Sequence, residues 1–467
     1  MSPSAPPTRT LLHGGVVITA DPATDVLPRG DVLIEGDRIA AVAARVEPPP
    51  GTEVVDVSGR IVMPGFVDTH RHTWQSVVRG YAANWTLGQY LAGIHSGLSR
   101  HFRPEDTYVA NLLGAVEALD SGITTLLDWS HNLYTPEHGD AAVQALRDAG
   151  LRAVFAHGGG AHEWGAVPSD VPHTGDVRRI RSEHFSSDGG LVTMAIALRG
   201  PQFTTPEVNA HDYALATDLD LPITVHVGDG EWGRSGPVRG LHRDGLLRDR
   251  TTYVHCCTLA DDELRMIADS GGSASVAPDV EMAMGHGWPA TGRLLRAGVR
   301  PSLSIDVCSL NGGDMFATMR TAIGVQRALD NEHHVREGSS PDRLDLTCRD
   351  VVEFATIDGA RACGLGDRTG SLTAGKQADV IVLAPSPATA PLNNPLGAVV
   401  YAAHPGLVDT VYVAGRCRKR SGRLLDIDLD DLVRRAVRSR DHLVSAYPDA
   451  GSGSEWFPGT VRPDDRQ

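Results

Sequence analysis

Apolar residues near both ends of the chain follow the short, alternating pattern of β-strands. Several runs are rich in β-branched residues, and Glu35-Gly-Asp-Arg between two of them fits a hairpin turn. The runs cover residues 10–19, 31–42 and 53–62 near the start, and 370–383 and 408–416 after strand-like texture returns beyond Gly366. We therefore predict a small β-sandwich built from both termini, with residues 1–63 and 368–423 as its parts.

Between these parts, apolar strand-like runs alternate with helix-like segments. The strand-like runs are residues 123–128, 151–157, 191–198, 222–227, 252–255 and 300–306. Such alternation over about 300 residues is typical of parallel strands joined by helices. We predict an α/β fold with a closed (β/α)8 TIM barrel over residues 64–367, because that length suits such a barrel.

The last part, residues 424–467, is predicted to be a helix followed by a tail. Asp428 is a suitable N-cap, and residues 451–467 are expected to be loosely ordered. The predicted apolar face of the helix consists of Leu429, Leu432, Val433, Ala436 and Val437.

Composition restricts the partners and the compartment. Hydrophobic residues make up 41% and charged residues 22% of the chain, as in soluble globular proteins. The net charge of −15 argues against binding to nucleic acid or to an anionic membrane. No apolar run of about 18 residues and no signal peptide is visible. The six cysteines show no spaced disulfide framework, so we expect a cytoplasmic protein with reduced thiols.

Histidines and an aspartate stand where predicted strands end. His70 and His72 are one residue apart, which on a strand points both to the same face, although this pair alone also fits a surface loop. His226, His255 and Asp306 likewise follow apolar runs directly. In a (β/α)8 barrel the carboxyl ends of the strands meet at one face, so we expect these side chains to form a metal site.

Several motifs in order along residues 10–420 resemble those of the amidohydrolase superfamily. They are most similar to its mononuclear aminohydrolase branch, which includes cytosine and guanine deaminases, S-adenosylhomocysteine deaminases and triazine hydrolases. The matching segments are Met63-Pro-Gly-Phe-Val-Asp-Thr-His-Arg-His, Arg79-Gly80, Gly122-Ile-Thr-Thr, Val225-His226, His255-Cys256, Asp306 with Asn311 and Asp314-Met-Phe, Ala355-Thr, and Gly370-Ser-Leu-Thr-Ala-Gly-Lys-Gln-Ala-Asp. The resemblance implies an enzyme that hydrolyses C–N bonds other than peptide bonds. The metal ligands that it implies are His70, His72, His226 and Asp306.

Lysine is almost absent, and this restricts the number of metal ions. Only Lys376 and Lys419 occur in the chain. Binuclear members of the superfamily often bridge two metals with a carboxylated lysine from a mid-barrel strand, and no lysine is available there. One divalent metal is therefore expected. Zinc is the default for a set of three histidines and one aspartate with an open position, while Fe²⁺ and Mn²⁺ accept similar ligands.

The resemblance also implies a mechanism. A divalent metal lowers the pKa of bound water to about 7, so that metal-bound hydroxide attacks a ring C–N carbon. Asp306 accepts the water proton and His255, beside that water, orients the hydroxide. An acid must protonate the ring nitrogen. Where the family has a glutamate this chain has Asp229, which is about 1.5 Å shorter in reach, and Glu231 is the alternative donor if the loop bulges.

Candidate substrate contacts lie near these positions. Gln75 stands where guanine and triazine hydrolases of the family place a glutamine that bonds the heterocycle. Trp74 and Trp85 either stack on a flat ring or fill the barrel mouth. Residues 277–289 replace the His-Asn-Pro pattern usual after the seventh strand, and Glu281 and His286 within them are candidates to read an amino or imino edge.

The predicted function is therefore a metal-dependent hydrolytic deaminase of a purine-, pyrimidine-, triazine- or pterin-like small molecule. Because Asp229 departs from the family pattern, hydrolysis of a C–Cl or cyclic amide bond on the same scaffold is the alternative. The complete ligand set argues against a metal-free assembly protein. Relatives often pair or form tetramers, so a homodimer or homotetramer is expected.

Overall fold

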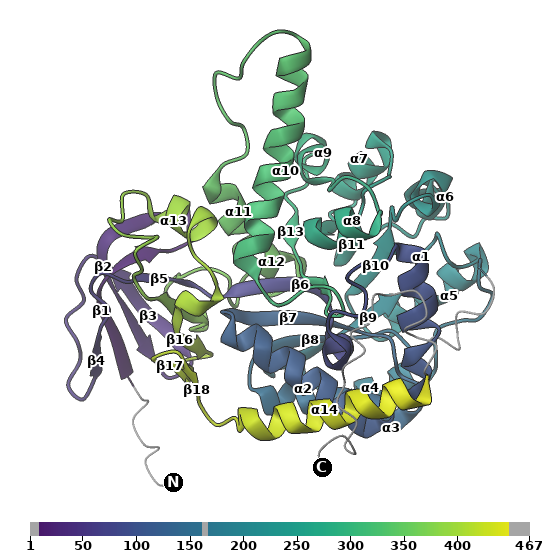
Figure 1. The fold of residues 1–467 in the computed structure, drawn as a ribbon, viewed down its shortest axis with the longest axis horizontal. Helices are drawn as coiled ribbons and strands as arrows, with labels where there is room; N and C mark the ends of the chain where they lie inside the picture. The colour runs from purple at the N-terminus through teal and green to yellow at the C-terminus, as the bar shows by residue number, and fades with distance from the viewer. Residues whose placement is uncertain (1–8, 161–166, 448–467) are drawn as a thin grey trace, which may run out of the picture.

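The computed structural model describes residues 9–160 and 167–447, in which the chain forms two β-sheets and a set of helices that lie mostly around one of them (Figure 1). One sheet, the mixed sheet, joins strands from the beginning and the end of the chain. The other, the parallel sheet, is built from the middle of the chain. The tail at residues 451–467, which we predicted to be loose, lies outside the described residues.

The mixed sheet joins both ends of the chain through β15, which pairs antiparallel with β5. Its strand order is β18-β17-β16-β15-β5-β1-β2-β3, with β4 alongside β1. The strands are β1 (Arg9–Ile18), β2 (Val26–Glu35), β3 (Arg38–Ala43), β4 (Glu53–Asp56), β5 (Ile61–Pro64), β15 (Val380–Leu383), β16 (Val408–Val413), β17 (Arg416–Arg420) and β18 (Arg423–Leu424). The predicted hairpin turn is confirmed, because Glu35 pairs with Arg38 and Gly36 between them has a φ of 60°.

The parallel sheet follows the order β13-β12-β11-β10-β9-β8-β7-β6-β14. Its strands are β6 (Phe66–His72), β7 (Ile123–Ser130), β8 (Arg152–His157), β9 (Val192–Leu198), β10 (Ile223–Val227), β11 (Thr251–His255), β12 (Ser273–Val276), β13 (Ser302–Leu303) and β14 (Asp306–Val307). Every residue of β6, β7 and β8 is buried, as expected for parallel strands covered on both faces. The predicted α/β fold with parallel strands in its middle part is confirmed.

The predicted strand at residues 300–306 is interrupted rather than continuous. Its first part, β13, pairs with β12, and its second part, β14, pairs with β6. Between them, the amide of Ile305 donates a hydrogen bond to Asp68 Oδ1 at 3.0 Å instead of to a neighbouring strand. The segment therefore reaches from one edge of the parallel sheet to the other.

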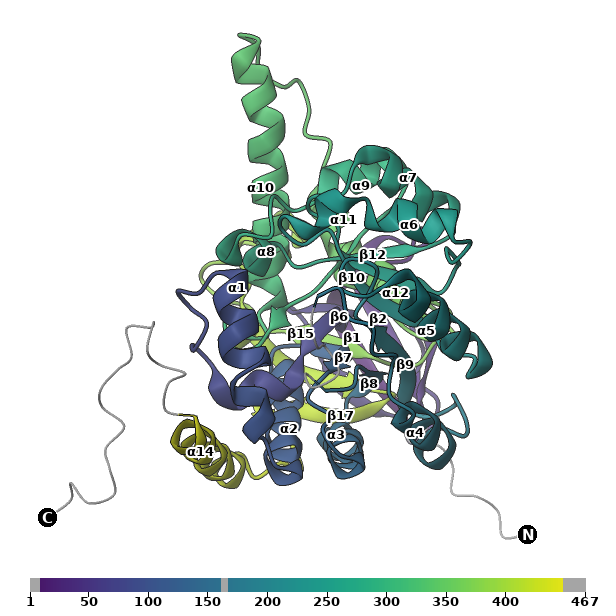
Figure 2. The same cartoon turned by 90° about the vertical axis from the view of Figure 1, so that its right-hand side faces the viewer.

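Helices follow most strands of the parallel sheet and lie around it (Figure 2). They are α1 (Leu87–Tyr90), α2 (Pro104–Asp120), α3 (Pro136–Ala149), α4 (Asp176–His184), α5 (Pro206–Asp218), α6 (Pro237–Arg243), α7 (Asp261–Asp269), α8 (Pro278–Met284), α9 (Thr291–Ala297), α10 (Met315–Arg336), α11 (Cys348–Phe354), α12 (Ile357–Ala362), α13 (Pro395–Tyr401) and α14 (Leu429–Ala446). Many begin with proline, whose missing N–H costs nothing in the first helical turn. The far end of α10 projects away from the body in Figures 1 and 2.

The last helix, α14, begins as predicted but buries only part of the predicted face. The Asp428 carboxylate accepts a hydrogen bond from the Asp431 amide at 2.9 Å, which confirms the N-cap. Leu432, Ala436 and Leu443 are buried, and α14 packs against α2. Three residues of the predicted face remain exposed, namely Leu429, Val433 and Val437. The apolar pattern is wide enough to fit two orientations, and packing on α2 selects one of them.

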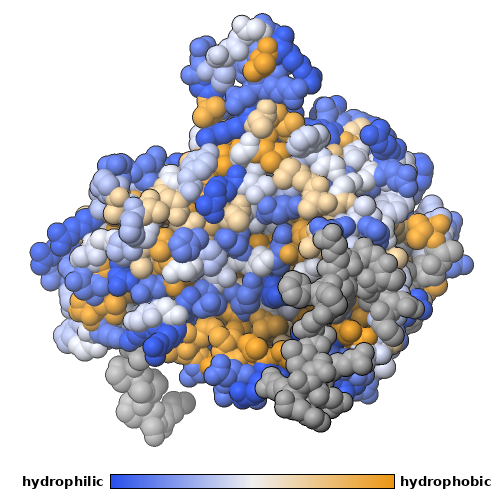
Figure 3. All heavy atoms as spheres, in the orientation of Figure 1, coloured by the Kyte–Doolittle hydropathy of each residue, from blue (hydrophilic) through white to orange (hydrophobic). Residues whose placement is uncertain are grey.

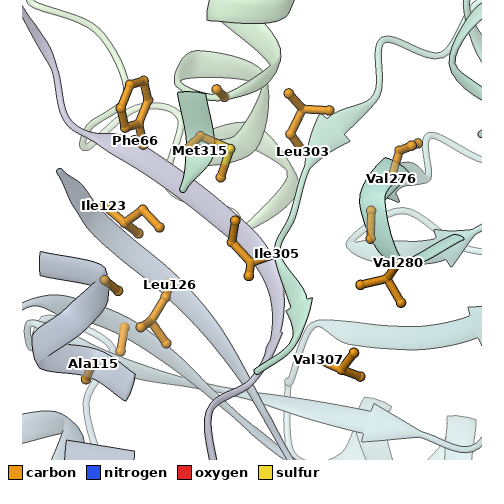
Figure 4. Packing of buried hydrophobic residues seen from close by; sticks show 14 of the residues in the cluster. Phe66, Ala115, Ile123, Leu126, Val276, Val280, Leu303, Ile305, Val307 and Met315 are labelled. Atoms are coloured by element: carbon orange, nitrogen blue, oxygen red, sulfur yellow. The ribbon is translucent and has the colours of Figure 1, made fainter. Parts of the chain in front are cut away.

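Apolar side chains from strands and helices fill the space around the parallel sheet. Phe66, Ile123 and Leu126 from the strands face Met315 and Ala115 from helices across this core (Figure 4). The opposite faces of the strands carry a separate cluster that includes Val67, Leu127, Trp129, Val154, Ala195 and Val254. Outside, hydrophilic residues cover most of the face drawn in Figure 3. Within the described residues, no helix has the length and apolar character that crossing a membrane requires.

Candidate active site

Two histidines on β6 begin the site. His70 and His72 are both buried, and their ring centroids are 4.7 Å apart. The Nδ1 atom of His72 lies 3.3 Å from the carbonyl oxygen of Trp129, which can only accept, so the imidazole proton is on Nδ1. The Nε2 atom of His72 is therefore free to bind a cation.

Asp306 at the start of β14 completes a compact group with this pair. Its Oδ1 atom lies 3.2 Å from Nε2 of His70 and 3.3 Å from Nε2 of His72. The pairing of β14 with β6 places Asp306 opposite Arg71, so a segment far away in sequence is brought beside the histidines. The sequence prediction that these three residues converge agrees with this placement.

His226 and His255 approach from the ends of the adjacent strands β10 and β11. The ring of His226 is 4.8 Å from that of His70, and the ligand-capable atoms of His70, His226 and His255 all lie within 4.8 Å of one another. The His255 Nε2 atom is 3.7 Å from Asp306 Oδ2. All five predicted strand-end residues therefore meet in one place.

The backbone at two of these positions is strained. His255 has a φ of 75° and Asp306 a φ of 64°, in the left-handed region that non-glycine residues rarely adopt. Such conformations persist where the surrounding fold holds them, and they gather at functional sites. Here they aim both side chains toward the same space.

The donor set suits a divalent cation. Among the described residues, neither ring nitrogen of His70 and neither carboxylate oxygen of Asp306 has a hydrogen-bond partner, although all four atoms are buried. Burial lowers the pKa of His70 to about 4 and that of His226 well below its ordinary value, so both rings are neutral. Burial works in the opposite direction at Asp306, but contacts with His70 and His72 hold the pKa of its carboxyl well below the usual range. Neutral imidazoles around one carboxylate are what Zn²⁺ and similar metals bind.

Asp229, of the two acids predicted as proton donors, is the one that reaches this group. It follows β10, is buried, and places Oδ1 at 3.6 Å from Nε2 of His255 and 3.5 Å from Nδ1 of His286. Glu231 is exposed and is not among the residues that line the pocket.

The charges around His255 raise its pKa and lower the pKa of Asp229. Burial lowers the pKa of His255, but Asp229, the hydrogen bond to Glu281, and Asp306 outweigh it and raise the pKa to about 9. Burial likewise disfavours the ionised form of Asp229, yet His255 and His286 lower the pKa of the carboxyl overall. In the metal-free protein, therefore, His255 carries a positive charge next to ionised carboxylates.

The predicted substrate contacts fall into two groups. His286 lines the pocket. Glu281 stands behind His255, with Oε1 3.2 Å from its Nδ1. Gln75, in the 3-10 helix η1 (Thr73–Val78), is buried outside the pocket lining. It donates to the hydroxyl of Tyr90 at 2.6 Å and accepts from Ser309 at 2.9 Å.

Both tryptophans lie outside the pocket lining as well. Trp74 is fully buried and packs on Phe102 and His131, to which its Nε1–H donates at 3.4 Å. Trp85 is buried near Tyr81. Both rings therefore pack against protein side chains.

The pocket has an empty volume of about 500 Å³ and contains residues that the sequence did not single out. The unpredicted wall residues include Leu87, Tyr90, Leu91, His95, Trp129, His131, Phe203 and Met284. His131 directly follows β7, so the rule of strand-end residues would have found it. His95 lies in the short helical turn η2 (Leu91–His95), and no sequence pattern marked it.

A parallel α/β sheet with a histidine–aspartate cluster at its carboxyl edge defines a class of hydrolytic enzymes. The chain belongs to one family in this class, the amidohydrolase family, which residues 61–418 match. The predicted resemblance is thus confirmed, as is the prediction of an enzyme that hydrolyses C–N bonds other than peptide bonds.

Individual relatives match over most of their length. The chain is 31% identical over 421 residues to a 5′-deoxyadenosine deaminase of Methanothermobacter thermautotrophicus, covering 88% of this chain and 94% of that protein. It is 30% identical over 426 residues to a 5-methylthioadenosine/S-adenosylhomocysteine deaminase of Symbiobacterium thermophilum, covering 87% and 93%.

Solved structures share the architecture. An adenosine deaminase of Xanthomonas campestris with bound zinc superposes with a TM-score of 0.82 at 27% identity, over 94% of this chain and 99% of that one. An atrazine chlorohydrolase of Arthrobacter aurescens complexed with zinc reaches a TM-score of 0.80 at 22% identity, over 92% and 100%, and shows the same fold.

Proposed function

We propose that this protein is a metal-dependent hydrolytic deaminase of an N-heterocyclic small molecule. The observation that carries the proposal is the convergence of His70, His72, His226 and Asp306 beside His255 at a pocket, where the described residues offer no hydrogen-bond partner to the buried nitrogens of His70 and carboxylate oxygens of Asp306. The deaminases among its relatives support this choice of reaction.

His70, His72, His226 and Asp306 are the proposed ligands of one divalent metal. Zinc is the preferred ion because the similar adenosine deaminase contains it, with Fe²⁺ and Mn²⁺ as alternatives. When bound, such a cation supplies a water whose pKa is about 7 and which is therefore nucleophilic at neutral pH.

Three residues of the chain then handle protons and orientation. Asp306 accepts the proton of the attacking water, because it is the carboxylate in the ligand group. His255 orients that water, since its Nε2 atom lies 3.7 Å from Asp306 Oδ2 and 3.6 Å from Asp229 Oδ1. Asp229 takes part in the transfer of a proton to the ring nitrogen. We place this role on Asp229 rather than Glu231, which is exposed.

The substrate class is an aminated ring, with adenine nucleosides first. The pocket walls supply aromatic and apolar side chains such as Trp129, Phe203 and Met284, which suit the faces of a flat heterocycle. His95 and His131 add polar groups to the same walls. The relatives that act on 5′-modified adenosines make these compounds the first to test.

The alternative is hydrolysis of a C–Cl or cyclic amide bond on the same scaffold. This alternative is retained because the resemblance places a longer glutamate at the position of Asp229. The acid that donates the proton influences which leaving group is assisted.

The test combines metal analysis with a substrate panel. Purified protein is analysed for bound metal by elemental analysis. Ammonia release is then measured with 5′-deoxyadenosine, 5-methylthioadenosine, S-adenosylhomocysteine, free purines, pyrimidines, pterins and triazines. About one metal per chain and ammonia from an aminated ring are expected. Turnover of only a chlorinated or lactam ring would replace the deaminase by the alternative.

Further proposals concern the architecture. We propose that the parallel sheet closes into an eight-stranded barrel in which β13 and β14 act as one strand, and the hydrogen bonds of Thr69 to Ser275 (2.7 Å) and Ser302 (2.9 Å) support it. We also propose that the mixed sheet folds into a sandwich, since it has an apolar cluster of its own.

We keep the domain boundaries 1–63, 64–367, 368–423 and 424–467 as a proposal. A homodimer or homotetramer and a cytoplasmic location are proposed as well.

A further inference from the structure

His286 occupies a distinctive position in the pocket. It follows α8, is 4% exposed, and turns Nδ1 toward Asp229 Oδ1 at 3.5 Å. Its ring centroid lies 4.6 Å from that of His255, nearly perpendicular to it at 74°. Neither of its ring nitrogens has a hydrogen-bond partner among the described residues. A buried, unpartnered imidazole in a pocket wall is costly unless a ligand uses it.

Asp229 is held through one of its two carboxylate oxygens. Its Oδ2 atom accepts a hydrogen bond from the Gln202 side chain, whose own oxygen accepts from the Gly228 amide at 2.8 Å. Its Oδ1 atom faces His255 and His286. Gln202 thus holds Oδ2, while Oδ1, which has no hydrogen-bond partner among the described residues, is turned toward the two histidines. The lowered pKa of Asp229 means that it holds charge rather than a proton.

We propose that His286, oriented by Asp229, delivers the proton to the ring nitrogen. The inference deepens the proposed deaminase and depends on it for the substrate. The imidazole reaches farther into the pocket than the carboxylate does, and the carboxylate orients the ring, as in other aspartate–histidine pairs.

The proton movements balance over one turnover. His286 gives its proton to the ring nitrogen as the C–O bond forms and the C=N electron pair moves onto that nitrogen. The amino group then leaves with the electrons of the breaking C–N bond and takes the proton that Asp306 accepted from water, so that ammonia departs. The hydroxyl proton of the adduct returns to His286 as the carbonyl forms.

A rescue experiment tests the pair in the metal-loaded enzyme. His286→Asn keeps an amide near the Nδ1 position but removes the nitrogen farther from Asp229. It should lower kcat by about 100-fold with little change in KM and with metal content unchanged. Asp229→Glu lengthens the carboxyl side chain by one methylene, so Asp229→Glu/His286→Asn should recover at least about 10-fold in kcat over His286→Asn alone. His333→Asn, on the exposed end of α10, is the control.

Two results overturn the pair. One is a His286→Asn enzyme whose kcat stays within about threefold of the parent. The other is a double variant no faster than His286→Asn, which would assign His286 a purely structural role. If the parent releases no ammonia from any ring, the proposed deaminase fails instead, and the same variants are run on the chlorinated or lactam substrate that it does turn over, because ring protonation assists either leaving group.

Discussion

The Nδ1 atom of His255 lies 3.2 Å from Oε1 of Glu281, and both side chains are buried. The same oxygen accepts the amide of Ala277 at 2.8 Å, so the carboxylate is fixed at the start of α8. This arrangement keeps a proton on Nδ1 of His255 and turns Nε2 toward Asp229 and Asp306.

Glu281→Gln should therefore slow the reaction without removing the metal. The amide still accepts a hydrogen bond, but it no longer stabilises a charged His255, so kcat should fall about 10- to 100-fold. Steady-state kinetics and elemental analysis check this. Asp279→Asn is the matched control on α8, since Asp279 contacts Thr318 and Thr321 rather than the site. A Glu281→Gln enzyme with parental kcat would remove Glu281 from any role in orientation.

Removing one proposed ligand should abolish both metal binding and turnover. His70→Ala takes away an imidazole whose two nitrogens have no hydrogen-bond partner among the described residues. A bound ion stabilises the fold by its binding free energy, so chelation should lower the Tm of the parent and leave that of His70→Ala unchanged. His333→Ala, 70% exposed on α10, should behave like the parent. Full metal content in His70→Ala would contradict the ligand assignment.

A buried ion pair joins the two sheets and should contribute strongly to the free energy of unfolding. Arg152 in β8 contacts Asp379, next to β15, through Nε at 2.7 Å and Nη2 at 3.1 Å, and both side chains are 1% exposed. Arg152→Met leaves that carboxylate buried without its cation, at a cost of about 3–5 kcal/mol in the free energy of unfolding. Urea denaturation measures it. Arg434→Met, at a 61% exposed side chain, should cost under about 0.5 kcal/mol, and a similar loss in both variants would refute the argument.

Acid should weaken the fold partly through Asp176 on α4. Contact with His157, and then the ion pair with Arg179, lower the pKa of Asp176 from 3.8 to about 2, although partial burial opposes them. A lowered folded pKa stabilises the protein above the unfolded value, so this contribution is complete above about pH 4 and disappears as the pH falls toward 2. Asp176→Asn should be less stable at pH 7, and its urea midpoint should change less between pH 4 and pH 2.5. Equal acid sensitivity of parent and variant would exclude the effect.

Local patterns predicted the parallel-sheet segments well because buried parallel strands are continuous apolar runs. β7 and β8 fall on the predicted runs at residues 123–128 and 151–157. The run at 300–306 was predicted as one strand, and its break at Ser304 and Ile305 depends on pairing with β6, which lies more than 200 residues earlier. The face of α14 likewise depends on α2, a partner that no local pattern identifies.

The sequence by itself determined the chemistry of this protein: which residues end the apolar strands, that nearly all of its basic side chains are arginines, and that Asp229 and Glu231 follow His226 closely. These are properties of residue type and spacing, which the chain carries before it folds. Only the tertiary structure decided that Asp229 rather than Glu231 faces the pocket, that Glu281 stands behind His255, and that His286 meets Asp229. Those relations depend on where loops from different strands come together in space, because a side chain's neighbours are set by long-range packing and not by its position along the chain.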